Sequence, residues 1–170
     1  MRYFIPVLFL LVILAACSSA DPESPETNDA LDELDAPFAA IISGDVEMEI
    51  TGTGYYACLT GQHVISNKAP GNTDLNNVVI NIEPDTVTGT HSISTAQINV
   101  PVSAYFVNLP DNGYYRDNVS GSLELTAIAT QPGEQIAGTF SFSAQRTNGE
   151  TINIVGQFDF TVPNDFTPCN

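Results

Sequence analysis

Two histidines are the side chains of this sequence best suited to acid–base or metal chemistry. Neither His63 nor His91 belongs to a set of histidines and cysteines with the short spacing of a metal motif. Serines are common, but no Gly-x-Ser-x-Gly elbow presents one as a nucleophile. We therefore predict a protein that is not an enzyme and uses no cofactor, with both histidines in ordinary strand or surface positions. The alternative is a small hydrolase whose site is built from loops.

Carboxylate and amide side chains offer a second kind of chemistry. Glu47 and Glu49 lie two positions apart in a period-two segment, so they share the wet face of a strand as solvated charges. Calcium takes oxygen ligands of this type, but the spacing does not match an EF-hand loop, and such residues also form turns. We predict no metal site and keep calcium as the alternative for one group of residues: Asp111, Asn112, Asp117, Asn118, Asp74, Asn76 and Asn77.

Three pairs of adjacent aromatic residues are candidates for binding. They occupy positions 55–56, 105–106 and 114–115. On a strand, neighbouring side chains point to opposite faces, so one member of each pair faces inward and the other outward. We predict that the outward members are Tyr56, Tyr105 and Tyr115, beside Asn and Asp residues, where they stack on a sugar or a protein partner. The alternative is that all are half-buried strand aromatics, which β propensity favours.

A cysteine near the N-terminus indicates a third chemistry, acylation. Leu14-Ala15-Ala16-Cys17 closes an apolar run that begins at Phe4 and follows the charge of Arg2. The run is shorter than the roughly 20 residues of a membrane-spanning helix, and its form is that of a secretory signal. The motif resembles the bacterial lipobox, where the chain is cut before the cysteine and its sulfur receives a diacylglycerol. We predict a signal peptide over 1–16 and lipidation of Cys17; the alternative is an ordinary signal with an incidental cysteine.

The predicted anchor and the net charge together limit location and partners. Ser18 rather than Asp follows Cys17, which favours the outer membrane if sorting resembles that of enteric bacteria. The chain has 20 acidic and 4 basic residues, and such a body is repelled by nucleic acid and by anionic lipid headgroups. We predict a membrane association through the N-terminal lipid, an envelope protein or glycan as partner, and no nucleic acid.

The two remaining cysteines form an even pair. An exported chain enters an oxidising compartment, and once Cys17 is acylated only Cys58 and Cys169 are left. We predict a disulfide between them, which fixes a C-terminal segment that would otherwise fray.

Residues 17–37 are expected to be the lipidated cysteine and an acidic tether. From Ser18 to Ala36 there are seven carboxylates, no Lys or Arg, and two prolines. Such a segment buries too little apolar surface to offset its ordering entropy, so we predict a disordered spacer. The alternative is a short helix over 29–35 that docks through Leu31 and Leu34.

Residues 38–170 are predicted to form a single all-β domain. Val46, Met48 and Ile50 alternate with polar residues, and no segment keeps a helical period. We expect an antiparallel β-sandwich of about eight strands, with a closed up-and-down β-barrel as the alternative. The expected strands include 55–60, 78–83, 88–94 and 97–109, with a polar loop over 66–77.

The last two strands allow a register to be derived. A loop over 147–149 with Gly149 in the left-handed region keeps the apolar faces together, whereas a two-residue turn would put polar residues on the phenylalanine face. A two- or four-residue loop within 131–134 extends this apolar face to a third strand. The predicted facing pairs are Phe142 with Ile154, Phe140 with Gly156, Phe158 with Gly138, Leu125 with Phe140, and Leu123 with Phe142.

Segments of this domain resemble a known set of sequences. The segments 89–93, 120–123, 136–144 and 152–158, among them Gly138-Thr139-Phe140-Ser141-Phe142-Ser143-Ala144, are similar to small bacterial cell-envelope lipoproteins with a Gly-Thr-Phe-Ser-Phe-x-Ala strand. The resemblance covers roughly residues 45–160. It implies an all-β fold and export, and the family has no assigned activity.

The leading hypothesis is therefore a lipid-anchored envelope protein that acts as a non-enzymatic binding module. Three structural outcomes would separate it from its alternatives. A filled core with outward tyrosines favours the binding module, and a cleft with a histidine near a serine and an aspartate favours the hydrolase. A cavity lined by Phe140, Phe142, Phe158 and Leu125 favours a carrier of small lipophilic ligands.

Overall fold

The computed structural model describes residues 30–69, 76–96, 100–108, 113–167 and 169. The predicted signal peptide, Cys17 and the tether up to residue 29 lie outside these residues, as do Asp74, Asp111 and Asn112. Within the described part of the chain, no helix has the length and apolar character needed to span a membrane.

The described residues form eleven strands, which confirms the all-β prediction. Their number exceeds the eight expected because Phe38–Gly44, Gln62–Ser66 and Gly113–Tyr115 form strands of their own. The strands are β1 (Phe38–Gly44), β2 (Met48–Gly52), β3 (Tyr55–Leu59), β4 (Gln62–Ser66), β5 (Asn77–Ile82), β6 (Gly89–Ser94), β7 (Val102–Asn108), β8 (Gly113–Tyr115), β9 (Asp117–Ala127), β10 (Gln135–Gln145) and β11 (Thr151–Thr161).

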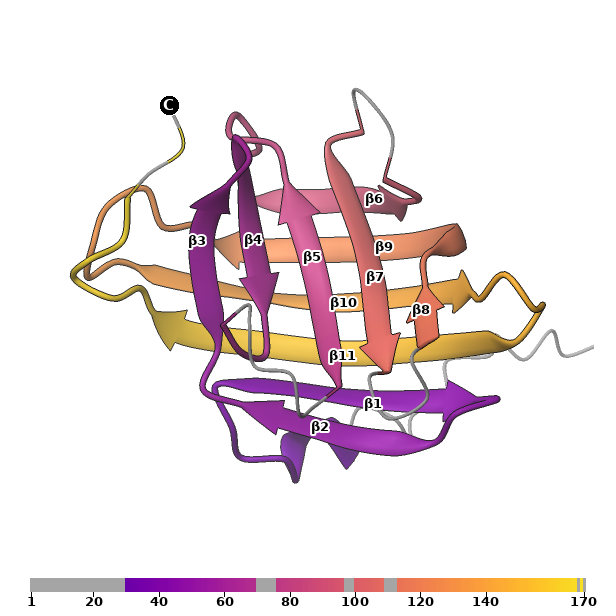
Figure 1. Ribbon diagram of the computed structural model, residues 1–170. Helices are drawn as coiled ribbons and strands as arrows, with labels where there is room; N and C mark the ends of the chain where they lie inside the picture. Colours follow the sequence, from indigo (N-terminus) through magenta and orange to yellow (C-terminus); the bar gives the residue numbers. More distant parts are fainter. Residues whose placement is uncertain (1–29, 70–75, 97–99, 109–112, 168, 170) are drawn as a thin grey trace, which may run out of the picture.

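All of these strands belong to one curled sheet with the order β2-β1-β11-β10-β9-β6-β7-β5-β4-β3, and β8 pairs with β7. Strands β6, β9, β10, β11, β1 and β2 make a back layer, and β3, β4, β5, β7 and β8 cross it as a front layer (Figure 1). The layers face each other as in a sandwich, while the continuous sheet gives a half-barrel. The pairing is antiparallel except at the corner, where Ser94 of β6 and Ser103 of β7 form a parallel bridge.

The register of β10 and β11 is the predicted one. Phe142 faces Ile154, Phe140 faces Gly156 and Gly138 faces Phe158. Gly149 closes the loop with a φ of 96°, in the region that glycine adopts without a Cβ clash. A Cβ on Gly138 would meet Cζ of Phe158 at 2.9 Å, so the ring does lie over bare backbone.

The register predicted between β9 and β10 is wrong by two residues. Leu123 faces Phe140, and Leu125 faces Gly138. One residue of the difference comes from the register shift at which Ala137 faces Ala127 but Gly138 faces Leu125. The other is present before that shift, next to a loop over 128–134 that is longer than expected. A two-residue slip keeps the alternation of faces. The expectation that three neighbouring strands share one apolar face is therefore confirmed.

The core lies between the two layers. Phe140, Phe142, Phe158 and Ile154 are all buried in it, as predicted. The chain after β11 adds Val162 and Phe166 to this core. The predicted disulfide then joins the end of this segment to β3, with the Cα atoms of Cys58 and Cys169 5.2 Å apart.

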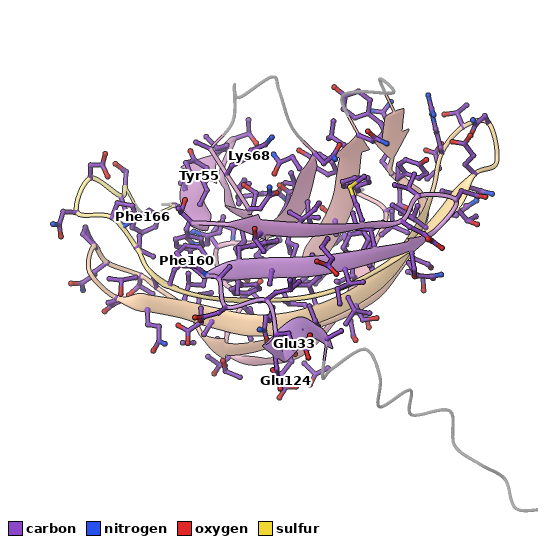
Figure 2. The ribbon with its side chains drawn as sticks, turned by 90° about the horizontal axis from the view of Figure 1, so that it is seen from below. Glu33, Tyr55, Lys68, Glu124, Phe160 and Phe166 are labelled. Carbon is purple, nitrogen blue, oxygen red and sulfur yellow. A yellow bond between two sulfur atoms is a disulfide. The ribbon has the colours of Figure 1, made fainter. Side chains whose placement is uncertain are left out.

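The end of the acidic segment is docked rather than extended into solvent. Residues 30–32 form a helical turn, and Leu31 is buried against the outer face of the back layer beside Thr139 and Gln157. Figure 2 shows this turn near Glu33 and Glu124, across the molecule from Tyr55 and Lys68 of the front layer. For residues 30–36 the structure thus agrees with the docked alternative and not with a disordered spacer.

Candidate functional site

In each aromatic pair one side chain faces inward and the other outward, as expected. Two of the three tyrosines predicted to face outward are nevertheless buried. Tyr56 is 3% exposed and donates its hydroxyl hydrogen bond to the carbonyl of Ala129 at 3.0 Å. Tyr115 is 2% exposed and donates to the carboxylate of Glu150 at 3.1 Å. Tyr105 points to the outer face, as predicted, and is half-buried there. The surface members of the other pairs are Tyr55 and Tyr114 instead.

Two of the outer tyrosines meet at the corner of the sheet. Strand β8 pairs with β7 so that Phe106 faces Tyr115, which leaves Tyr105 and Tyr114 on the opposite side of both strands. Strands β6 and β7 share a single bridge and run in different directions on either side of it (Figure 1). This corner hollow has a volume of about 500 Å³ and is lined by Thr95, Ala96, Ala104, Tyr105, Tyr114, Arg116 and Asp117.

The cation Arg116 lies beside the ring of Tyr114, and the acidic residue Asp117 lines the same hollow. The guanidinium carbon of Arg116 stands 5.7 Å from the ring centre of Tyr114, within the range of a cation–π contact. Among the described residues, no carboxylate forms an ion pair with Arg116, whereas Arg146 pairs with Glu150 at 3.2 Å. Burial raises the pKa of Tyr105, and Tyr114 raises it further. The phenol of Tyr105 is therefore a protonated donor at neutral pH.

Arg116 and Tyr114 were not singled out from the sequence. The available signal was the rarity of basic residues: Arg116 is one of four in the chain and directly follows an aromatic pair. Tyr114 is the outer member of that pair and is 46% exposed. Strand alternation alone does not tell which of two adjacent tyrosines faces out.

The histidines do not form a catalytic group with the described serines and carboxylates. His63 is buried and stacks on Tyr56 with ring centres 5.2 Å apart, and its Nδ1 has no hydrogen-bond partner among the described residues. Nε2 of His91 lies 2.7 Å from the carbonyl oxygen of Val87. Neither ring is hydrogen-bonded to a serine hydroxyl or an aspartate in the part of the chain that the structure describes.

The residues named for a carrier cavity fill space with one another. Phe140 contacts Phe142 and Phe158, with ring centres 6.2 and 6.3 Å apart. Leu125 belongs to the same core cluster. A separate hollow that touches Phe140 opens on the outer face of the back layer, where Leu31 and Thr139 line it. These contacts fit a filled core rather than a ligand cavity between the layers.

Two of the described residues of the calcium alternative make local hydrogen bonds. Asp117 accepts from the hydroxyl of Thr147 at 3.2 Å, and the amide of Asn118 donates to Gln145 at 2.6 Å. Asn76 and Asn77 lie at the start of β5 in the front layer. Across the described residues, no three His, Cys, Asp or Glu side chains gather as a metal site would require.

Glu47 and Glu49 are exposed at and just before β2, as expected of solvated charges. The corner hollow combines aromatic, cationic and anionic residues in one concavity. No protein-family model, curated protein or solved structure matches this chain.

Proposed function

We propose that this chain is an exported cell-envelope protein, held to the outer membrane by lipid on Cys17, that acts as a non-enzymatic binding module. The observation that carries the proposal is the pair Tyr105 and Tyr114 beside Arg116 in an open hollow, on a domain whose aromatic core packs on itself. Concave sites with aromatic walls and a few polar groups are the usual form of ligand pockets. Its partner is an envelope protein or glycan.

The anchor rests on Leu14-Ala15-Ala16-Cys17 and on the acidic segment that follows it. Acyl chains contribute about 0.8 kcal/mol per buried CH₂, so two or more chains attach a protein stably. The test is the intact mass of the protein produced in a Gram-negative host that processes lipoproteins. A chain starting at Cys17 with added acyl mass is expected, and Cys17→Ser should leave an uncut precursor or a soluble protein. A wild-type mature mass without acyl groups contradicts the anchor.

The binding role is tested by NMR on the isotope-labelled full chain in detergent micelles. Solubilised envelope protein and solubilised envelope polysaccharide are added as separate fractions. A binding module predicts saturable shifts at Thr95, Tyr105, Tyr114 and Arg116 with at least one fraction. Tyr114→Ser should abolish them, while Tyr55→Ser, an outer tyrosine three strands away from β7, should not. An absence of shifts with both fractions contradicts the proposed function.

A further inference from the structure

The charges around the corner hollow restrict what it can bind. The chain has a formal net charge of −16, so its long-range field repels anionic ligands. Arg116 disfavours a cationic ligand at short range, because its guanidinium stands 5.7 Å from the ring centre of Tyr114 and repels a second positive charge there. Asp117, next in the chain, also lines this hollow, and one of its carboxylate oxygens accepts a hydrogen bond from Thr147. A ligand without net charge avoids both penalties.

The other groups in the hollow indicate what that uncharged ligand must offer. Tyr105 and Tyr114 present apolar ring surface that also ends in a hydroxyl. Arg116 supplies only donors, and Asp117 supplies only acceptors. The matching ligand has an apolar face and an edge that carries several groups able both to donate and to accept. A pyranose ring has this form, with C–H bonds on its face and hydroxyls around its edge.

From this match we propose that the corner hollow binds an uncharged glycan. This inference rests on the proposed function and names the class of its ligand. One sugar ring stacks on Tyr114 or Tyr105, and its hydroxyls hydrogen-bond with Arg116 and Asp117. Tyr114 is 46% exposed before binding, so it offers ring surface without rearrangement of the core. The binding free energy comes from burial of this ring surface together with hydrogen bonds that replace water.

A matched series of oligosaccharides tests the ligand class. The full chain in detergent is titrated calorimetrically with neutral N-acetylglucosamine, cellulose and maltose tetramers. The cationic glucosamine tetramer and the anionic galacturonic acid tetramer serve as charged counterparts. The expected result is saturable binding of at least one neutral tetramer, at least tenfold tighter than either charged one. Equal or tighter binding of a charged tetramer, or no binding of any neutral one, overturns the proposal.

Variants locate the binding on the hollow. Tyr114→Ser and, separately, Arg116→Gln should each weaken the neutral sugar at least tenfold, while Tyr55→Ser leaves its affinity unchanged. An unchanged thermal midpoint shows that each variant is folded, as expected for exposed side chains. Equal weakening by Tyr55→Ser, or none by Tyr114→Ser, overturns the assigned site. If no neutral tetramer binds but envelope protein still shifts the hollow residues, the ligand class is wrong and the binding module stands.

Discussion

Phe142 is a core residue whose truncation should strongly lower the stability of the domain. It is buried between the layers, packs on Phe140 and faces Ile154 across the hairpin. Truncation of a buried phenylalanine to alanine leaves a cavity, so Phe142→Ala should lower the free energy of unfolding by roughly 3–5 kcal/mol. Urea denaturation measures this. Ser141→Ala, one position away on the wet face, is the control and should change stability by less than about 0.5 kcal/mol. A loss below about 1 kcal/mol for Phe142→Ala would contradict the burial.

His63 should make the domain sensitive to mild acid. It is buried beside Tyr56 and Phe166, and burial lowers its pKa below the value of about 6.5 found in unfolded chains. As pH falls through 6.5, the unfolded chain takes up a proton that the folded chain still excludes, so stability decreases until the folded pKa is reached. His63→Phe should remove this part of the loss between pH 7 and pH 5, measured as urea midpoints. Identical pH profiles for the two proteins would refute the assignment.

The sequence alone does not predict which tyrosines are buried, and the reason is physical. Tyr56 is inside because its hydroxyl finds the carbonyl of Ala129, 73 positions away in the chain. Tyr115 likewise finds Glu150. Which member of an adjacent pair faces inward depends on such distant acceptors, and strand alternation predicts only that the two members differ.

At the scale of elements, Gly156 of β11 lies between β1 and β10, with no room for a side chain. A Cβ added there would lie 2.7 Å from the carbonyl oxygen of Ala39 in β1 and would overlap the ring of Phe140 in β10. Gly156→Ala should therefore destabilise the domain by about 1–3 kcal/mol through overpacking. The matched control is Gly133→Ala, where nothing lies within 4 Å and only the left-handed backbone, with φ at 82°, is strained. Thermal unfolding compares them, and a Gly156→Ala protein as stable as wild type would show that the strands separate freely.

The disulfide joins the edge strand β3 to the segment that follows β11. Cys58 and Cys169 are 111 positions apart. In the chain-entropy model, a loop of this length contributes about 4–5 kcal/mol by restricting the unfolded chain, less any native strain. Replacing both cysteines by alanine should lower the free energy of unfolding by up to this amount in denaturant titrations. Loss of the disulfide should also increase the rate of amide hydrogen exchange more at Phe166 than at Phe142. No change in either measurement would mean that the core alone holds the segment.

The sequence predicted the elements whose partners are close in the chain. The register of β10 and β11 followed from phenylalanines that face glycines across a short loop. The register of β9 was not predicted because neither the longer loop over 128–134 nor the shift at Ala137–Gly138 is encoded in the apolar alternation, which a two-residue slip preserves. β4 was missed because its five residues join the turn after β3 and were partly assigned to a polar loop.

At the scale of the molecule, the candidate site is made by topology. Tyr105 belongs to β7, Arg116 follows β8 and Thr95 follows β6. The sequence identified the aromatic pairs, but the corner between β6 and β7 depends on a sheet that turns from one layer into the other. Residue types alone do not predict that turn.

Whole-molecule assembly depends on the last strand. β1 lies between β2 and β11, and seven of its residues pair with β11. A chain ending at Glu150 lacks β11 and should show no cooperative unfolding transition by circular dichroism. A chain ending at Val162 with Cys58→Ala keeps β11 and should still unfold cooperatively, at a lower midpoint. A cooperative transition in the shorter chain would show that the other ten strands suffice.

The pairing of β1 with β11 also affects the order in which the strands can pair during folding. During synthesis or threading, β1 emerges more than a hundred residues before the strand that must lie beside it. Contacts between such distant segments form late, because the intervening chain must first be brought together at an entropic cost. For the export that we propose, this order would be useful, since the chain would stay unfolded at β1 while it is drawn through a membrane. On that proposal, β1 and β11 pair only after nearly all of the chain has crossed.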